Sequence, residues 1–285
     1  MILFSRNVRE NPQLKESFFE LAKEVFGIRF DLWEETGGWT RAYIPYCFHE
    51  DGQVLANASV NLMKLTVEGK IYDAVQIGTV MTRKEYRGQG LSEKLLRKIL
   101  SDFEGKTELI YLFADEDAVS LYQRVGFESR NTVRHFLHAE DYSEEGNQLL
   151  PVEKNIEELM ALKNASVPLT DRLWNKEDRH ILPFYYVHGF RDMIVEPIKD
   201  VTILAETEGD TFHLYDVLSP HRVSLTEVLQ SVVPPSALRI ELHFTPQEML
   251  PGLYTEPDPD NGFMIHKSSS AVMPNNLTYP TIITA

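Results

Sequence analysis

The sequence predicts an α/β protein of the α+β type, in which two domains each carry a mixed, mostly antiparallel sheet flanked by helices. Its 285 residues suit two domains of about 100–150 residues. Runs of alternating apolar and polar residues joined by tight turns indicate antiparallel hairpins, and other segments repeat apolar residues at helical spacing. The polar stretch Glu140–Gln148, which ends at Pro151, is the best linker. We therefore expect domains at 1–140 and 151–285.

The first half opens with a helix after Asn11-Pro12, because apolar residues recur on one side of the segment that follows. Gly52 and Gly69 then mark two hairpin turns. A change to helical spacing follows, and Gly105 ends that helix. In chain order we expect three strands, a helix, a strand, a short helix and a strand, at Tyr43–His49, Gln53–Val67, Lys70–Thr82, Leu91–Phe103, Leu109–Phe113, Asp117–Arg124 and Phe127–Leu137.

The second half repeats this order more weakly. It predicts a helix, three strands, a helix and two further strands, at Ile156–Ala165, Met193–Glu196, Val201–Thr207, Thr211–Leu218, Leu225–Val232, Leu238–Phe244 and Gly262–His266. We therefore interpret the second half as a degenerate copy of the first.

Composition excludes several classes of function. The net charge is −15 and both halves are acidic, so a nucleic-acid partner, which needs a concentrated basic face, is not expected. No apolar run is long enough to span a membrane, and the N-terminal residues do not resemble a signal peptide. Cys47 is the only cysteine, which favours a reducing compartment. We expect a cytoplasmic protein with no membrane partner, and the oligomeric state is left open.

The segment Val80–Ser92 carries the strongest chemical signal. It joins a predicted strand to an amphipathic helix through Arg87-Gly-Gln-Gly. Glycines let backbone N–H groups approach an anion closely, and a helix N-terminus adds unpaired donors and partial positive charge. Arg87 can add a charge-assisted hydrogen bond to the same phosphate. The pattern lacks the third glycine of the dinucleotide fingerprint and the Gly-Lys-Ser/Thr of the nucleoside-triphosphate loop.

This segment resembles the Arg-x-x-Gly-x-Gly/Ala pyrophosphate-binding signature of the Gcn5-related N-acetyltransferases (GNAT), running here from Lys84 or Arg87 through Gly88 and Gly90. A second segment, Ala118–Phe127, is similar to the family's Ala-x-x-Leu-Tyr-x-x-x-Gly-Phe. The resemblance implies the GNAT fold and acetyl-CoA as co-substrate without a metal. It implies CoA contacts from Val80, Thr82, Arg87, Gly88, Gln89, Gly90, Leu91, Ser92 and Tyr122.

Tyr122 would protonate the departing thiolate, a role that a phenol suits. One residue departs from the family pattern, because Asp115 stands where many members have Asn, three residues before the alanine. Aspartate can still cap a helix, but an amide contact with pantetheine would be lost.

The two-domain order resembles the core of the multi-acetylating aminoglycoside acetyltransferases linked to intracellular survival in mycobacteria. The corresponding loop of the second half, Ser219–Ser224, contains no glycine, so we expect one CoA site per chain. In those enzymes the C-terminal carboxylate is the general base, which here would be that of Ala285. Glu34 and Glu35, between Trp33 and Trp39, are the alternative candidates.

The sequence leaves three candidate functions open. The first is acetyl transfer to a primary amine of a small molecule by direct transfer in a ternary complex. The second is a CoA-binding sensor or scaffold without turnover, and the third is acetylation of a protein or peptide. His49, His135, His138, His180, His188 and His266 form no metal-ligand spacing, and we expect structural roles for them. Cys47 has no activating pattern and is expected to be a strand residue.

Overall fold

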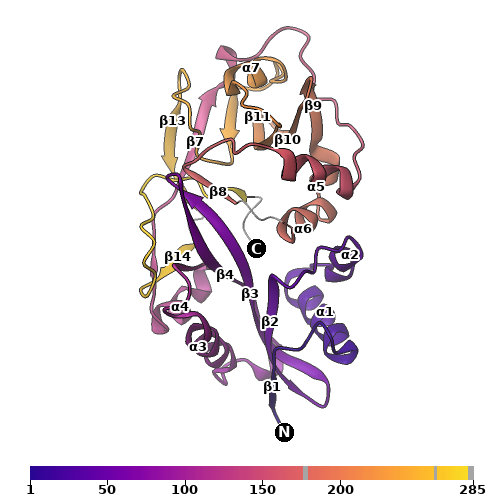
Figure 1. The fold of residues 1–285 in the computed structure, drawn as a ribbon, viewed down its shortest axis with the longest axis vertical. Coiled ribbons are helices and arrows are strands. Elements are labelled where there is room, and N and C mark those ends of the chain that lie inside the picture. Colours follow the sequence, from indigo (N-terminus) through magenta and orange to yellow (C-terminus); the bar gives the residue numbers. More distant parts are fainter. Residues whose placement is uncertain (176–178, 260–261, 282–285) are drawn as a thin grey trace.

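The computed structural model describes residues 1–175, 179–259 and 262–281. Figure 1 shows two lobes stacked along the long axis, each built around one sheet with helices on it. The hairpin of β3 and β4 rises from the lower lobe and reaches the upper one. Both sheets are mostly antiparallel, which confirms the predicted α+β class. Among the described helices, none is long and apolar enough to cross a membrane.

The lower lobe contains most of the first half. Its elements are β1 (Leu3–Ser5), α1 (Pro12–Phe26), α2 (Phe30–Glu35), β2 (Tyr43–Glu50), β3 (Gln53–Val67), β4 (Lys70–Thr82), α3 (Leu91–Phe103), β5 (Leu109–Phe113), α4 (Val119–Arg124) and β6 (Phe127–Ser129). The predicted strands β2–β5 and the helix α3 are confirmed, because alternation, turn glycines and helical spacing all act locally. β1 and α2 were not predicted.

The upper lobe contains most of the second half. Its elements are β7 (Val133–His138), α5 (Ile156–Ala165), α6 (Ile181–Val187), β9 (Ile194–Ile198), β10 (Val201–Glu208), β11 (Thr211–Leu218), α7 (Leu225–Gln230), β12 (Arg239–Leu242) and β13 (Tyr254–Pro257). Two strands of this half, β8 (Leu173–Asn175) and β14 (Phe263–His266), belong instead to the lower sheet. α7 is two residues shorter than predicted, and α6, β8 and β13 were not predicted.

The two sheets have the same strand plan. The lower sheet runs β2-β3-β4-β5-β14-β6, and the upper sheet runs β9-β10-β11-β12-β7-β13. In each sheet one pair is parallel, β4 with β5 below and β11 with β12 above, and a helix connects its two strands. This correspondence supports the interpretation of the second half as a copy of the first.

The lobes exchange one strand each. β14 comes from the end of the chain and pairs with both β5 and β6, whereas β7 comes from the first half and pairs with β12 and β13. The prediction of one strand over Phe127–Leu137 is therefore wrong. The chain forms β6 and then leaves the lower sheet for the upper one, because these two short strands have different partners.

Close backbone contact fixes β14 in the lower sheet. The Ala114 amide donates to the Gly262 carbonyl over 2.8 Å, and a Cβ on Gly262 would lie 2.3 Å from the Ala114 carbonyl oxygen. Only glycine fits there. A shared apolar core of both halves lies behind the strand and includes Tyr111, Leu204 and Tyr279.

A buried ion pair lies within the upper lobe. Lys163 on α5 lies 2.6 Å from Asp216 on β11, and both side chains are less than a tenth exposed. Such a pair stabilises only while both partners are present, because removing one leaves a buried charge. The ion pair therefore fixes the position of α5 on the upper sheet.

The strand exchange predicts that the two sequence halves cannot fold separately. A fragment of residues 1–150 keeps β7 without β12 and loses β14 from between β5 and β6 of its own sheet. We expect the full chain to melt in one cooperative transition and this fragment to show none by circular dichroism and calorimetry. Co-expression with residues 151–285 should restore the transition. Cooperative melting of the fragment alone would contradict the dependence of the lower sheet on β14.

Candidate active site

A cavity of about 230 Å³ lies where β4 and β5 of the lower sheet separate, and residues of α6 from the other lobe also line it. β4 and β5 pair in parallel from Ala74 and Leu109 as far as Ile77 and Leu112. Beyond this point β4 continues to Thr82 while β5 ends, so the two strands separate. Side chains of both lobes line the resulting space, among them Phe30, Trp33, Asn61, Phe113, Asp115, Tyr122, His180 and Phe184.

A bulge in β4 shapes the floor of the cavity. Thr79 has φ 50°, an uncommon value for a non-glycine residue. Its hydroxyl accepts from the Tyr43 hydroxyl over 2.9 Å, and its carbonyl accepts from the Asn57 amide over 2.9 Å. These bonds hold the backbone of Gly78–Val80 against the cavity, with no β5 strand beside it. The predicted contact residue Val80 is thus at the site.

Tyr122 reaches the same cavity from α4. It is 5% exposed, and its hydroxyl has no hydrogen-bond partner among the residues that the structure describes. Burial, and to a lesser extent the charge of Asp115, raises the pKa of Tyr122 above its ordinary value. The phenol is therefore protonated at neutral pH and can act as a proton donor.

Asp115 does not cap the following turn through its side chain, contrary to the expectation for this position. The turn is closed by the backbone instead, since the Ala118 amide donates to the Asp115 carbonyl over 2.9 Å. The carboxylate lines the cavity beside Tyr122.

The glycine loop lies between β4 and α3, on the surface. Gly88 and Gly90 have φ 77° and 73°, a region that favours glycine, and a Cβ on either would meet nothing within 4 Å. Backbone conformation, not crowding, therefore selects glycine here. Gly90 is the N-cap of α3, a helix of 13 residues, and lacks a side chain that could occupy the first N–H groups. This geometry suits an anion.

The other predicted loop residues have distinct environments. Thr82 and Ser92 bring their hydroxyls to 2.8 Å of each other, which ties the strand end to the first helical turn. Arg87 is exposed and donates through Nε to the Thr82 carbonyl over 3.1 Å. Gln89 is exposed, whereas Leu91 is buried in the core under α3. Leu91 could therefore offer a ligand only its backbone.

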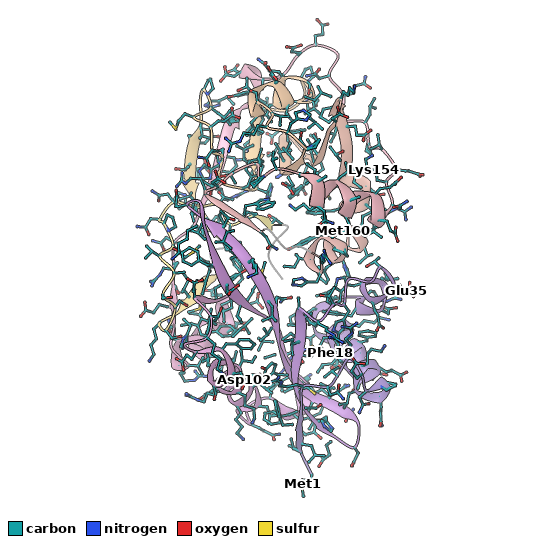
Figure 2. All side chains as sticks on the ribbon, in the orientation of Figure 1. Met1, Phe18, Glu35, Asp102, Lys154 and Met160 are labelled. Carbon is teal, nitrogen blue, oxygen red and sulfur yellow. The ribbon has the colours of Figure 1, made fainter. Side chains whose placement is uncertain are left out.

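The predicted acidic candidates lie away from the cavity. Glu35 is exposed at the end of α2, and Figure 2 shows it on the outer side of the molecule. Glu34 is paired with Lys15 over 2.7 Å. Trp33, by contrast, is buried against Trp39 and lines the cavity, because the helical turn sends neighbouring side chains in different directions. Ala285 lies outside the described residues.

Two polar side chains at the cavity were not predicted as site residues. His180, at the start of α6, is 2% exposed, and its Nε2 has no hydrogen-bond partner in the described chain. Asn61 on β3 is equally buried, and its amide nitrogen has no partner there either. A lone histidine before an aromatic run gives no signal in the sequence, so the expected structural role was the simpler interpretation.

A second polar cluster involves residues that could hold a metal. The ligand atoms of His213, Glu241 and His243 all lie within 4.8 Å of one another. Arg134, however, binds both carboxylate oxygens of Glu241, one of them over 2.7 Å. Sequence spacing could not reveal the group, because it forms across the parallel pair β11 and β12.

The cavity and the loop together suit transfer from a phosphate-bearing carrier. A protonated phenol and unpaired strand backbone face an aromatic-lined space, while an anion-binding loop follows the same strand. The carrier's phosphates and its reactive end can thus be held by consecutive parts of β4, the loop and α3.

Comparisons with known proteins agree with this geometry. Residues 11–130 match the family model described as acetyltransferase (GNAT) domain. A comparison with curated proteins finds no significant sequence match.

Several solved structures share the fold of both lobes. A probable N-acyltransferase of unknown function from Enterococcus faecalis is 13% identical, with TM-score 0.64, covering 95% of this chain and 73% of that one. A GCN5-related N-acetyltransferase from Anabaena variabilis is 14% identical, with TM-score 0.60 and coverage of 93% and 72%. Eis1 from Mycobacterium abscessus is 12% identical, with TM-score 0.60 and coverage of 94% and 74%.

The family match covers the strand, loop and helix that build the site, and the structural likeness extends to the two-lobed fold. Residues 11–130 therefore form an acetyltransferase (GNAT) domain, and through this domain the chain is an acyltransferase.

Proposed function

We propose that the protein transfers an acetyl group from acetyl-CoA to a primary amine of a small molecule, directly, in a ternary complex. The observation that carries this proposal is Tyr122, whose hydroxyl has no hydrogen-bond partner in the part of the chain that the structure describes, in a cavity shared with the backbone of Gly78–Val80. A tyrosine with a purely structural role would bury its hydroxyl against a hydrogen-bond acceptor.

The proposed reaction uses three parts of the chain. The loop from Arg87 to Gly90 and the first turn of α3 hold the pyrophosphate, while the backbone near Val80 holds the pantetheine arm as an added strand would. The acceptor nitrogen attacks the thioester carbonyl carbon, the C–S bond breaks, and Tyr122 gives its proton to the sulfur. Positioning of the two substrates supplies much of the rate.

A small acceptor fits this cavity better than a polypeptide. The space is compact, and α6 of the upper lobe closes it on the side of α2. Aromatic rings of Phe30, Trp33 and Phe184 line it, and Asp115 adds a carboxylate. Aromatic faces and a carboxylate both attract an approaching ammonium group. The net charge of −15 acts in the same direction over longer range.

The direct test is a thiol-release assay with acetyl-CoA and a panel of small amines, peptides and protein N-termini. We expect release with small amines that carry an apolar or aromatic group. CoA binding without thiol release from any acceptor would identify a sensor or scaffold. Release with peptides alone would identify a protein acetyltransferase.

Reversing the charge of Arg87 should weaken CoA binding. A charge-assisted hydrogen bond contributes about 1.5–3 kcal/mol, so Arg87→Glu should raise the dissociation constant by at least tenfold, measured by calorimetry. Lys106→Glu is the matched control, because it makes the same charge change at the other end of α3. Equal affinities of both variants would remove Arg87 from the phosphate site. The wild type should bind one CoA per chain.

Tyr122→Phe should lower turnover by roughly 10²–10⁴-fold with little effect on CoA affinity. Its stability should not fall, because no protein hydrogen bond to this hydroxyl is lost. Tyr142→Phe is the reciprocal control, since the Tyr142 hydroxyl donates to the Pro251 carbonyl over 2.8 Å, remote from the cavity. That variant should lose about 1 kcal/mol of stability and keep its turnover. Turnover of Tyr122→Phe within twofold of wild type would reduce Tyr122 to a packing residue.

A further inference from the structure

The second half supplies the cavity with a buried histidine that the fold leaves unsatisfied. His180 Nε2 has no partner in the described chain, and a buried polar group left without one costs about 1–3 kcal/mol. Two other buried histidines of the protein are bonded: His266 Nε2 contacts the Val125 carbonyl over 3.0 Å, and His135 Nδ1 contacts the Thr278 hydroxyl over 2.6 Å. His49 Nδ1 is also buried without a partner in the described chain, and of these two unpaired histidines only His180 lines the cavity.

The position of His180 is fixed across the lobes. The indole Nε1 of Trp33 donates to the His180 carbonyl over 2.7 Å, and both residues are buried. The next residues, Ile181 and Phe184, face the same cavity from α6. The main chain of His180 is thus anchored to the lobe that holds Tyr122, and His180 is one of the residues that line the shared cavity.

We propose that His180 contacts the amine of the acceptor and receives its proton during acetyl transfer, while the Asn61 amide donates a hydrogen bond to a second polar group of the acceptor. This rests on the proposed function. With these two contacts, the expected acceptor is an amine with a hydroxyl or carbonyl close to the nitrogen and an apolar or aromatic portion. The upper lobe would then provide a catalytic residue without binding CoA.

The chemistry balances between the two lobes. The ammonium group of the acceptor first gives one proton to solvent, and the neutral amine attacks. Its nitrogen becomes strongly acidic as it bonds to the acetyl carbon. His180 Nε2 takes that proton, the C–S bond breaks, and Tyr122 supplies a proton to the sulfur. Solvent returns the proton from His180 to Tyr122 after the products leave. Burial lowers the pKa of His180 to about 4, so the imidazole is neutral and able to accept before the reaction.

The cavity offers Asn61 a matching role. Its side-chain nitrogen is a donor, buried and without a partner in the described residues, so it requires an oxygen from the occupant. A site built to hydrogen-bond one group rejects an analogue that lacks it more strongly than an apolar site would.

The experiment compares His180→Gln with wild type on an amine that the thiol-release panel identifies. We expect kcat to fall by roughly 10²–10⁴-fold, CoA affinity to stay the same, and the melting temperature not to decrease. His135→Gln is the control, because it removes a buried, bonded histidine outside the cavity. It should lower the melting temperature and leave kcat near the wild-type value. If His180→Gln does not fold, His180→Asn is measured in the same way.

The role of Asn61 is tested with a matched pair of probes, 2-amino-1-phenylethanol and 2-phenylethylamine. Wild type should prefer the hydroxylated amine in kcat/KM by about tenfold or more, a preference that Asn61→Leu should abolish mainly through KM. Equal kcat/KM values for the two amines with wild type would overturn the part assigned to Asn61.

The outcomes separate this proposal from the function on which it rests. An active wild type with His180→Gln within twofold of its kcat would overturn the role of His180 alone. If deletion of Thr284 and Ala285 then abolished turnover, the base would be the terminal carboxylate. A wild type that binds CoA but acetylates no amine would refute the proposed function, and this inference would fail with it.

Discussion

The pairing of β14 with β5 and β6 is the contact on which the rest of the structure depends. This strand comes from the end of the chain and lies between β5 and β6, on the edge of β5 opposite β4. In return β7 completes the upper sheet beside β12. Because the exchange is reciprocal, neither sheet is whole without the other half, and the close approach at Gly262 tolerates no side chain. The lower sheet is therefore stabilised by distant parts of the sequence.

The second half has no glycine loop of its own, but its residues line the cavity of the lower lobe. The segment Ser219–Ser224 has lost the features of a phosphate site, yet the lobe still carries α6 to the rim of the lower cavity. Trp33 of α2 and His180 of α6 are joined by a buried hydrogen bond, so the lobes are connected at the site itself. The upper lobe thus forms part of the wall of a cavity whose floor lies in the lower lobe.

The sequence predicts the parts of the fold that depend only on neighbouring residues. Alternation and turn glycines define the hairpin of Gln53–Val67 with Lys70–Thr82, and glycines at positive φ define the loop before Leu91. Strand partners are not local, so the segment 127–137 was interpreted as one strand although it serves two sheets. The site was predictable in the same measure. A motif predicts the residues next to the glycine loop, but no motif marks the single histidine of the other half. The sequence also does not show that Trp33 faces the cavity while Glu35 faces away from it.

The cavity combines features that a fold selected for stability alone would avoid. His180 and Asn61 each have a buried polar atom without a partner in the described chain, and both residues line, with Tyr122, a cavity that also contains aromatic rings. Each such atom costs about 1–3 kcal/mol if it stays unsatisfied, a large share of the net stability of a domain. The three residues come from three different elements, α4, α6 and β3, so no local conformational preference explains their convergence. An occupant that contacts all three would stabilise the lower sheet, its strand-separated end and the upper lobe together. Binding at this site and the cohesion of the two lobes are therefore parts of one equilibrium.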